Sequence, residues 1–87
     1  MKSYKIVISK SAEKEISKLS VKEILKIRET ILNLADNPRP FGVKKLEGFD
    51  DFYRIKKGNY RIIYTIEDDI LTVEVLKVGN RKDVYKR

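Results

Sequence analysis

Residues 53–64 read YRIKKGNYRIIY, two segments of alternating apolar and basic residues separated by Gly58-Asn59. A Gly-Asn pair between two such segments is typical of a two-residue hairpin turn. With that turn, Lys57 pairs with Tyr60, and each step outward pairs residues whose numbers have the same sum. Lys56 then lies directly opposite Arg61. The remaining predicted pairs are Ile55 with Ile62, Arg54 with Ile63 and Tyr53 with Tyr64.

A second tight turn at Asp68-Asp69 would extend this hairpin into a further strand. In that register Arg61 faces Leu76 and Tyr64 faces Val73. Because successive side chains of a strand point to opposite faces, the residues divide into two sets, one for each face of the sheet. The face to be covered by helices carries Tyr53, Ile55, Ile62, Tyr64, Ile66, Leu71, Val73 and Val75. The opposite face carries Arg54, Lys56, Arg61, Ile63, Glu74 and Leu76.

The N-terminal half supplies the cover for this sheet. A β-branched run at 4–8 predicts a first strand, and Ser9 or Ser11 can cap a short helix. Ser20 and Glu23 match a capping box at the start of a second helix, which should end before Asn37-Pro38. The apolar stripes of the two helices are Ala12, Ile16 and Leu19, then Ile24, Ile27, Ile31 and Leu34, the latter flanked by Val21, Leu25 and Leu32.

These elements predict a single α+β domain over residues 1–87. Strands are expected near 4–8, 43–46, 52–57, 60–66 and 70–78. The short connection between the helices favours an antiparallel helical hairpin packed on one face of a four- to five-stranded sheet. After the N-terminal strand and the helices, the rest of the sheet should be an antiparallel meander.

The composition limits the chemistry. Among the 87 residues there is no Cys and no His, which excludes a zinc centre and a His-based triad, and no cofactor is expected. The opening MKSYKIVISK has no apolar run long enough for a signal peptide, so we expect a cytoplasmic location. Twenty basic and thirteen acidic residues give a net charge of +7, which makes a polyanion a plausible partner.

The predicted pairing of Lys56 with Arg61 suggests where a polyanion would bind. Like charges directly opposite each other on a sheet are destabilising, so an anion that bridges them is one interpretation. The other is that long basic side chains splay into water and discourage edge pairing. Ile63 and Leu76, predicted to lie uncovered among these charges, favour a partner. The segment 79–85 adds more cations and an aromatic residue beside the same face.

Two stretches carry a family resemblance. KKLEGFDDFYRIKKGNYRIIY at 44–64 and VLKVGNRKDVYKR at 75–87, placed after a strand and a helical hairpin, resemble the RelE/ParE superfamily of small toxins, and more closely its RelE-type messenger-RNA endonucleases. The resemblance spans nearly the whole chain. It implies a ribosome-dependent endoribonuclease, with messenger RNA in the ribosomal A site, ribosomal RNA and a cognate antitoxin as partners.

The resemblance also implies site residues. The family's basic set falls at Arg54, Lys56 and Arg61, and its C-terminal arginine and tyrosine fall at Arg81 and Tyr85. Lys56, Arg61, Arg81 and Tyr85 are the candidate catalytic residues, and Arg54, Lys57, Asn80 and Lys82 are the candidate RNA contacts. This chain departs from the family pattern at Arg54, where relatives have a lysine, and at Asn80, where relatives often have His or Lys.

RNA can be cleaved without a metal when the adjacent 2′-hydroxyl attacks the phosphorus. Arg61 and Arg81 suit stabilisation of the transition-state charge, because a guanidinium donates two parallel hydrogen bonds to phosphate oxygens. Either Lys56 or Tyr85 can serve as general base, and the general acid stays open. Tyr85 has an alternative role in stacking on an unpaired base.

Two other functions fit the same residues: a ParE-like inhibitor of DNA gyrase, and a non-catalytic basic binding module. The lysines at 10, 14, 18, 22 and 26 recur every four residues, which is typical of a solvated helix face and would also allow contact with ribosomal RNA.

Overall fold

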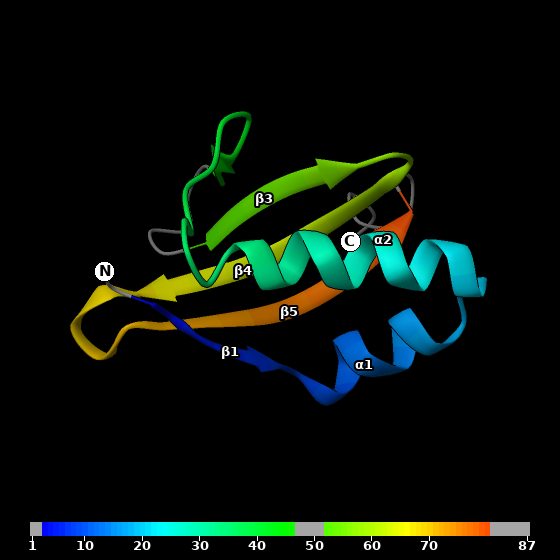
Figure 1. The fold of residues 1–87 in the computed structure, drawn as a ribbon, viewed down its shortest axis with the longest axis horizontal. Coiled ribbons are helices and arrows are strands. Elements are labelled where there is room, and N and C mark those ends of the chain that lie inside the picture. The colour runs from blue at the N-terminus through cyan, green and yellow to red at the C-terminus, as the bar shows by residue number, and fades with distance from the viewer. Residues whose placement is uncertain (1–2, 47–51, 81–87) are drawn as a thin grey trace.

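The computed structural model describes residues 3–46 and 52–80, which form two helices and a five-stranded sheet (Figure 1). The elements in chain order are β1 (Lys5–Ile8), α1 (Lys10–Ser17), α2 (Val21–Asn33), β2 (Lys44–Lys45), β3 (Phe52–Lys57), β4 (Tyr60–Glu67), the 3₁₀ turn η1 (Asp68–Ile70) and β5 (Thr72–Asn80). The order of strands across the sheet is β1-β5-β4-β3-β2. The predicted α+β class and the antiparallel meander of β2 to β5 are confirmed.

The N-terminal strand adds a feature that the sequence did not predict. β1 pairs in parallel with β5, from Lys5 beside Thr72 to Ile8 beside Val75, so the sheet is mixed. Backbone hydrogen bonds at both ends of β1 fix this register: Lys5 N donates to Leu71 O at 2.7 Å and Ser9 N donates to Val75 O at 2.9 Å. The first and last strands of the described residues therefore lie side by side.

Both helices begin where the predicted caps lie. The hydroxyl of Ser9 accepts a hydrogen bond from the amide of Ala12 at 3.0 Å, and Ser20 and Glu23 form the reciprocal capping box. α2 ends at Asn33, shortly before Pro38, whose ring cannot continue a helix. Across residues 3–46 and 52–80, neither helix has the length and apolarity to cross a bilayer.

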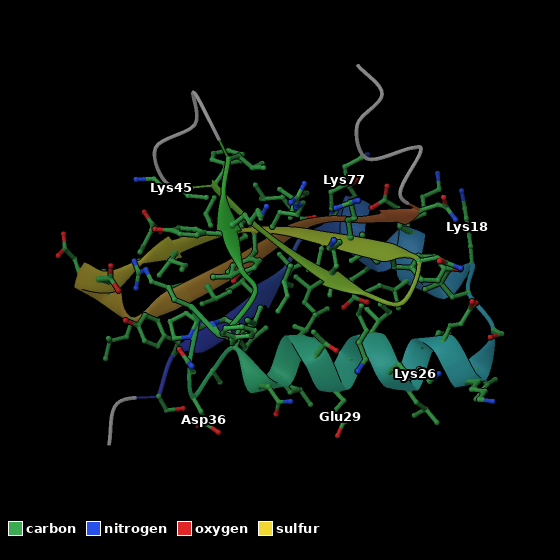
Figure 2. The ribbon with its side chains drawn as sticks, turned by 90° about the horizontal axis from the view of Figure 1, so that it is seen from above. Lys18, Lys26, Glu29, Asp36, Lys45 and Lys77 are labelled. Atoms are coloured by element: carbon green, nitrogen blue, oxygen red, sulfur yellow. The ribbon has the colours of Figure 1, made fainter. Side chains whose placement is uncertain are left out.

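One core joins the helices to the sheet. α2 lies across one face of the sheet, and α1 packs against β5 beyond the end of β1 (Figures 1 and 2). The core consists of Ala12, Ile16, Ile27, Ile31, Leu34, Ile62, Tyr64, Ile66, Val73, Val75 and Val78. The apolar residues that flank the α2 stripe stay outside it: Val21, Leu25 and Leu32 are 75%, 64% and 63% exposed.

The predicted register between β4 and β5 was wrong. Asp68-Asp69 is not a two-residue turn, because Asp68–Ile70 forms a 3₁₀ turn and Leu71 follows with a left-handed φ of 46°. Ile66 therefore pairs with Val73, and Leu71 lies in the loop and not in the ladder. The loop is two residues longer than predicted, so the alternation of faces is unchanged as far as Val75.

A bulge then changes the second half of β5. Tyr64 pairs with Val75, whereas its neighbour Ile63 pairs with Lys77, so Leu76 is an extra residue on β5. Beyond the bulge Val78 enters the core at 2% exposed, and Arg61 lies opposite Gly79 instead of the predicted Leu76.

Candidate nucleic-acid interface

The β3–β4 hairpin has the predicted turn and register. Gly58 has a φ of 61° and Asn59 does not share a positive φ, which is the pattern of a II′ hairpin turn with glycine at its first central position. Lys56 lies opposite Arg61, and Arg54 lies opposite Ile63. The hairpin thus places two cations of adjacent strands side by side.

The pairings across four strands gather further cations onto the same face. One row across the sheet runs through Lys44, Arg54, Ile63 and Lys77, and the next row runs through Lys56, Arg61 and Gly79. Because side chains alternate along a strand, residues two apart in these rows share a face. Figure 2 shows Lys77 on the side of the sheet away from α2. We call Lys44, Arg54, Lys56, Arg61 and Lys77 the cationic face.

The sequence reasoning missed two of these five residues. Lys44 falls in the strand predicted at 43–46, and its pairing with the β3 residue Arg54 would have revealed it. Lys77 reaches this face only because the bulge at Leu76 reverses the alternation in β5. No local signal marks that bulge.

The burial of the cationic face differs from the prediction. Ile63, predicted to be uncovered, is only 8% exposed, and Leu76 is half-buried in the bulge. Arg61 is 5% exposed and is the one buried charged side chain among residues 3–46 and 52–80, whereas Lys56 is exposed and Arg54 is half-buried. A guanidinium keeps its proton when buried. Arg61 therefore places a fixed positive charge where water screens it weakly.

Lys77 also has a structural role at the sheet edge. Its ammonium lies 3.2 Å from Oε2 of Glu15 in α1. The other carboxylate oxygen of Glu15 accepts a hydrogen bond from the backbone amide of Val78 at 2.7 Å. Glu15 thereby caps the edge of β5 just after the bulge and fixes the end of the row that contains Lys77.

The structure separates Lys57 and Asn80 from the other candidate RNA contacts. Both pair with Tyr60, in a row next to that of Lys56 and Arg61, so alternation directs them to the face that α2 covers. The candidate residues therefore lie on two sides of the hairpin tip. Arg81, Lys82 and Tyr85 lie outside the described residues.

A hydrogen bond ties the tip of the hairpin to α2. The hydroxyl of Tyr60 donates to Oε2 of Glu23 at 3.1 Å. Partial loss of hydration and this bond raise the pKa of Tyr60. The pKa of Glu23 is lowered, first by the backbone amide of Ser20 in the capping box and then by the Tyr60 hydroxyl.

The opposite end of the sheet is acidic and cross-linked. The guanidinium of Arg39 donates two hydrogen bonds to the carboxylate of Asp68, at 2.9 and 3.3 Å. Its Cζ lies 5.3 Å from the centroid of the Tyr53 ring. Tyr4 donates to the same carboxylate at 2.6 Å. Glu67 and Asp69 add to the negative charge there. These carboxylates lie at the end of the sheet away from the β3–β4 turn. In the described ranges, acidic side chains form no group of three or more that would hold a metal ion.

Comparison with known proteins agrees with this geometry. The family described as "ParE toxin of type II toxin-antitoxin system, parDE" matches residues 6–85 of the chain. The chain belongs to the RelE/ParE toxin superfamily. "Putative toxin RelE1" of Methanocaldococcus jannaschii is 30% identical over 86 residues, covering 95% of this chain and 96% of that relative.

Other members of the superfamily place the chain with its RelE-type toxins. "mRNA interferase toxin RelE" of Escherichia coli K12 is 30% identical over 86 residues, covering 94% of this chain and 90% of that protein. The archaeal RelE–RelB complex from Pyrococcus horikoshii contains a chain that superposes with a TM-score of 0.81 at 31% identity, with 91% of this chain and 96% of that chain covered. The RelE-type resemblance predicted from the sequence is confirmed.

Proposed function

We propose that this chain is a ribosome-dependent endoribonuclease that cleaves messenger RNA, and that a cognate antitoxin holds it inactive in the cytoplasm. One observation supports the proposal above the others: Lys56 and Arg61 lie directly opposite each other on the cationic face. A fold gains no stability from this pair, whereas a bound phosphate would turn the repulsion into two attractive contacts. The mRNA interferase with 30% identity and the RelE–RelB complexes among the structural relatives support the substrate and the antitoxin.

The proposed reaction uses the RNA's own 2′-hydroxyl as nucleophile. The 2′-oxygen attacks the adjacent phosphorus and the bond from phosphorus to the 5′-oxygen breaks. This leaves a 2′,3′-cyclic phosphate, and the departing 5′-oxygen takes up a proton from water to give a free 5′-hydroxyl. Arg61 and Arg81 bind the non-bridging oxygens, on which negative charge grows. Lys56 or Tyr85 accepts the 2′-proton, and Arg54 orients the neighbouring phosphate.

The test is cleavage of a defined messenger RNA on translating ribosomes, with the new 5′ ends mapped by primer extension. Arg61→Lys keeps the charge but loses the planar fork, so we expect the cleavage rate to fall by about 100-fold or more. Arg61→Ala, Arg81→Ala and Tyr85→Phe should also reduce cleavage while the circular dichroism spectrum stays unchanged. Lys5→Ala, on the exposed edge strand β1, is the matched control and should cleave as the wild type does.

The matching family is named for ParE toxins, and this match supports a second candidate function. A ParE-like protein would inhibit DNA gyrase and leave RNA intact. Supercoiling by purified gyrase, measured beside the ribosome assay, separates the two functions. Wild-type protein that blocks supercoiling and produces no new messenger-RNA ends would overturn the endoribonuclease proposal.

A further inference from the structure

A pocket of about 390 Å³ lies on the helix side of the hairpin tip, between α2 and the β3–β4 turn. Its walls include Glu23, Lys26 and Ile27 of α2 and Lys57, Asn59 and Tyr60 of the hairpin. A volume of this size is within the range of small-molecule sites. None of the roles proposed above for the cationic face uses this pocket.

The walls combine the two kinds of surface that a nucleotide needs. Lys26 and Lys57 are both exposed and line the pocket from α2 and from the hairpin, so two cationic side chains are available to a phosphate there. Ile27 is 1% exposed and gives an apolar floor, and Tyr60 offers an aromatic ring against which a base can stack. Asn59 adds an amide at the rim.

Glu23 acts on this pocket through Tyr60. One of its carboxylate oxygens accepts from the amide and hydroxyl of Ser20, at 3.3 and 3.2 Å, and the other accepts from the Tyr60 hydroxyl at 3.1 Å. Most of its capacity to accept hydrogen bonds is therefore used within the protein. Glu23 is a positioning residue that fixes the Tyr60 ring, and its charge reduces the repulsion between the two lysines.

The pocket continues into the cationic face around the turn. A second hollow of about 210 Å³ lies on the other side of the hairpin tip and is lined by Lys56 and Arg61. Gly58, Asn59 and Tyr60 border both hollows, so only the turn separates them. A single RNA strand whose phosphate is held at Lys56 and Arg61 can pass the tip and enter the pocket with a neighbouring nucleotide.

We propose that the pocket between α2 and the hairpin tip binds one nucleotide of the RNA, adjoining the phosphate held on the cationic face, with its phosphate at Lys26 and Lys57 and its base against Tyr60 and Ile27. The inference rests on the proposed endoribonuclease function for its substrate class. It assigns recognition of a flanking nucleotide to the helix side of the hairpin, where Lys57 lines the pocket.

The test is an NMR titration of the ¹⁵N-labelled full chain with 5′-AMP, with adenosine and inorganic phosphate as separate probes. We expect 5′-AMP to shift the amide signals of Ile27, Gly58, Asn59 and Tyr60. It should bind about 5- to 150-fold more tightly than inorganic phosphate, which is the gain expected from stacking one base. Adenosine should shift the same signals at higher concentration.

Variants on the two walls locate the binding. Lys26→Ala and Lys57→Ala should each weaken 5′-AMP binding about fivefold, whereas Lys22→Ala, an exposed lysine about one turn earlier in α2, should leave it unchanged. Tyr60→Leu should reduce the affinity for 5′-AMP to that for phosphate. Tyr60→Phe keeps the ring and should retain most of the affinity, which separates stacking from a general loss of structure.

Each outcome tests nucleotide binding in the pocket separately from the endoribonuclease activity. Three results would each overturn the proposal that this pocket binds a nucleotide. They are amide signals that shift only on the cationic face, equal affinities for 5′-AMP and phosphate, and equal weakening of 5′-AMP binding by Lys22→Ala and Lys26→Ala. If wild-type protein cleaves messenger RNA on ribosomes in a parallel assay, such a result leaves the proposed function standing. If it does not cleave, the proposed function fails whatever the titration shows.

Discussion

Replacing Lys56 with glutamate should stabilise the fold and abolish most of the proposed activity. Lys56 lies directly opposite Arg61 on the β3–β4 ladder, and Lys56→Glu turns this like-charge pair into an opposite-charge pair. Like charges facing each other cost some tenths of a kcal/mol, and opposite charges contribute about 0.2 to 1 kcal/mol. The combined change is about 0.5 to 1.5 kcal/mol in the free energy of unfolding.

The size of the chain converts this free energy into a melting temperature. With about 2.1 cal/mol/K of unfolding entropy per residue, 87 residues give about 0.18 kcal/mol/K, so the range corresponds to about 3 to 8 °C. Lys56 is exposed, and screening by water places the expected rise in the lower half, at about 3 to 5 °C. Cleavage of messenger RNA should fall by about 100-fold or more, since the change removes a cation that is proposed to contact the reacting groups.

Differential scanning calorimetry at low and high salt measures the change in Tm, with Lys5→Glu as the control. Lys5 is an exposed strand residue that pairs with Thr72, so its replacement changes the net charge equally without altering a charge pair. We expect Lys56→Glu to exceed Lys5→Glu in Tm at 20 mM salt and the difference to shrink at 500 mM. A Tm for Lys56→Glu at or below that of Lys5→Glu at low salt would refute the view that the fold bears a cost at this pair.

Two further predictions concern the contacts that hold the hairpin and the loop before β2. Tyr64→Phe removes the 2.7 Å hydrogen bond from a fully buried hydroxyl to the carbonyl of Pro38, so urea unfolding should show a loss of about 1 to 2 kcal/mol, and an unchanged midpoint would contradict it. The lowered pKa of Glu23 means that the folded state favours the charged form of this side chain. Charged Glu23 therefore stabilises the folded state above its ordinary pKa of about 4.5. This stabilisation is lost as the pH falls through the pKa of the folded state. The Tm of the wild type should therefore exceed that of Glu23→Gln at pH 7, and the difference should shrink below about pH 4.5; a difference that is constant with pH would contradict the assignment.

The predictable parts of the fold are those with local signals. Gly58 supplies the positive φ that a two-residue turn needs, and the whole β3–β4 register follows from it. The capping box at Ser20 and Glu23 likewise marks the start of α2. Where the signal is missing, the prediction failed: Leu71 occupies a left-handed position that usually takes glycine or asparagine, so nothing in the sequence shows that the β4–β5 loop is longer.

Long-range pairing limited the prediction in the same way. The parallel contact of β1 with β5 joins residues almost seventy positions apart, and an apolar strand carries no mark of its neighbour. The candidate site was affected at Lys77, whose face depends on the bulge, and at Arg61, whose burial no period-two pattern reveals. Alternation along the strand could have separated Lys57 from Lys56, since adjacent residues of a strand point to opposite faces, but both were predicted to lie at one RNA site.

The hydrogen bond between Tyr60 and Glu23 joins the tip of the β3–β4 hairpin to the start of α2. β3 and β4 lie within the five-stranded sheet, but Lys56 and Arg61 repel each other in the row next to the turn, which weakens the pairing there. Tyr60 is the first residue of β4 and the neighbour of Arg61, and its hydroxyl is bonded to the residue that caps α2. The cap of the helix thus restrains the strand that carries Arg61. The same bond positions the ring of Tyr60 at the α2 pocket, so Glu23 contributes to the arrangement on both sides of the hairpin tip.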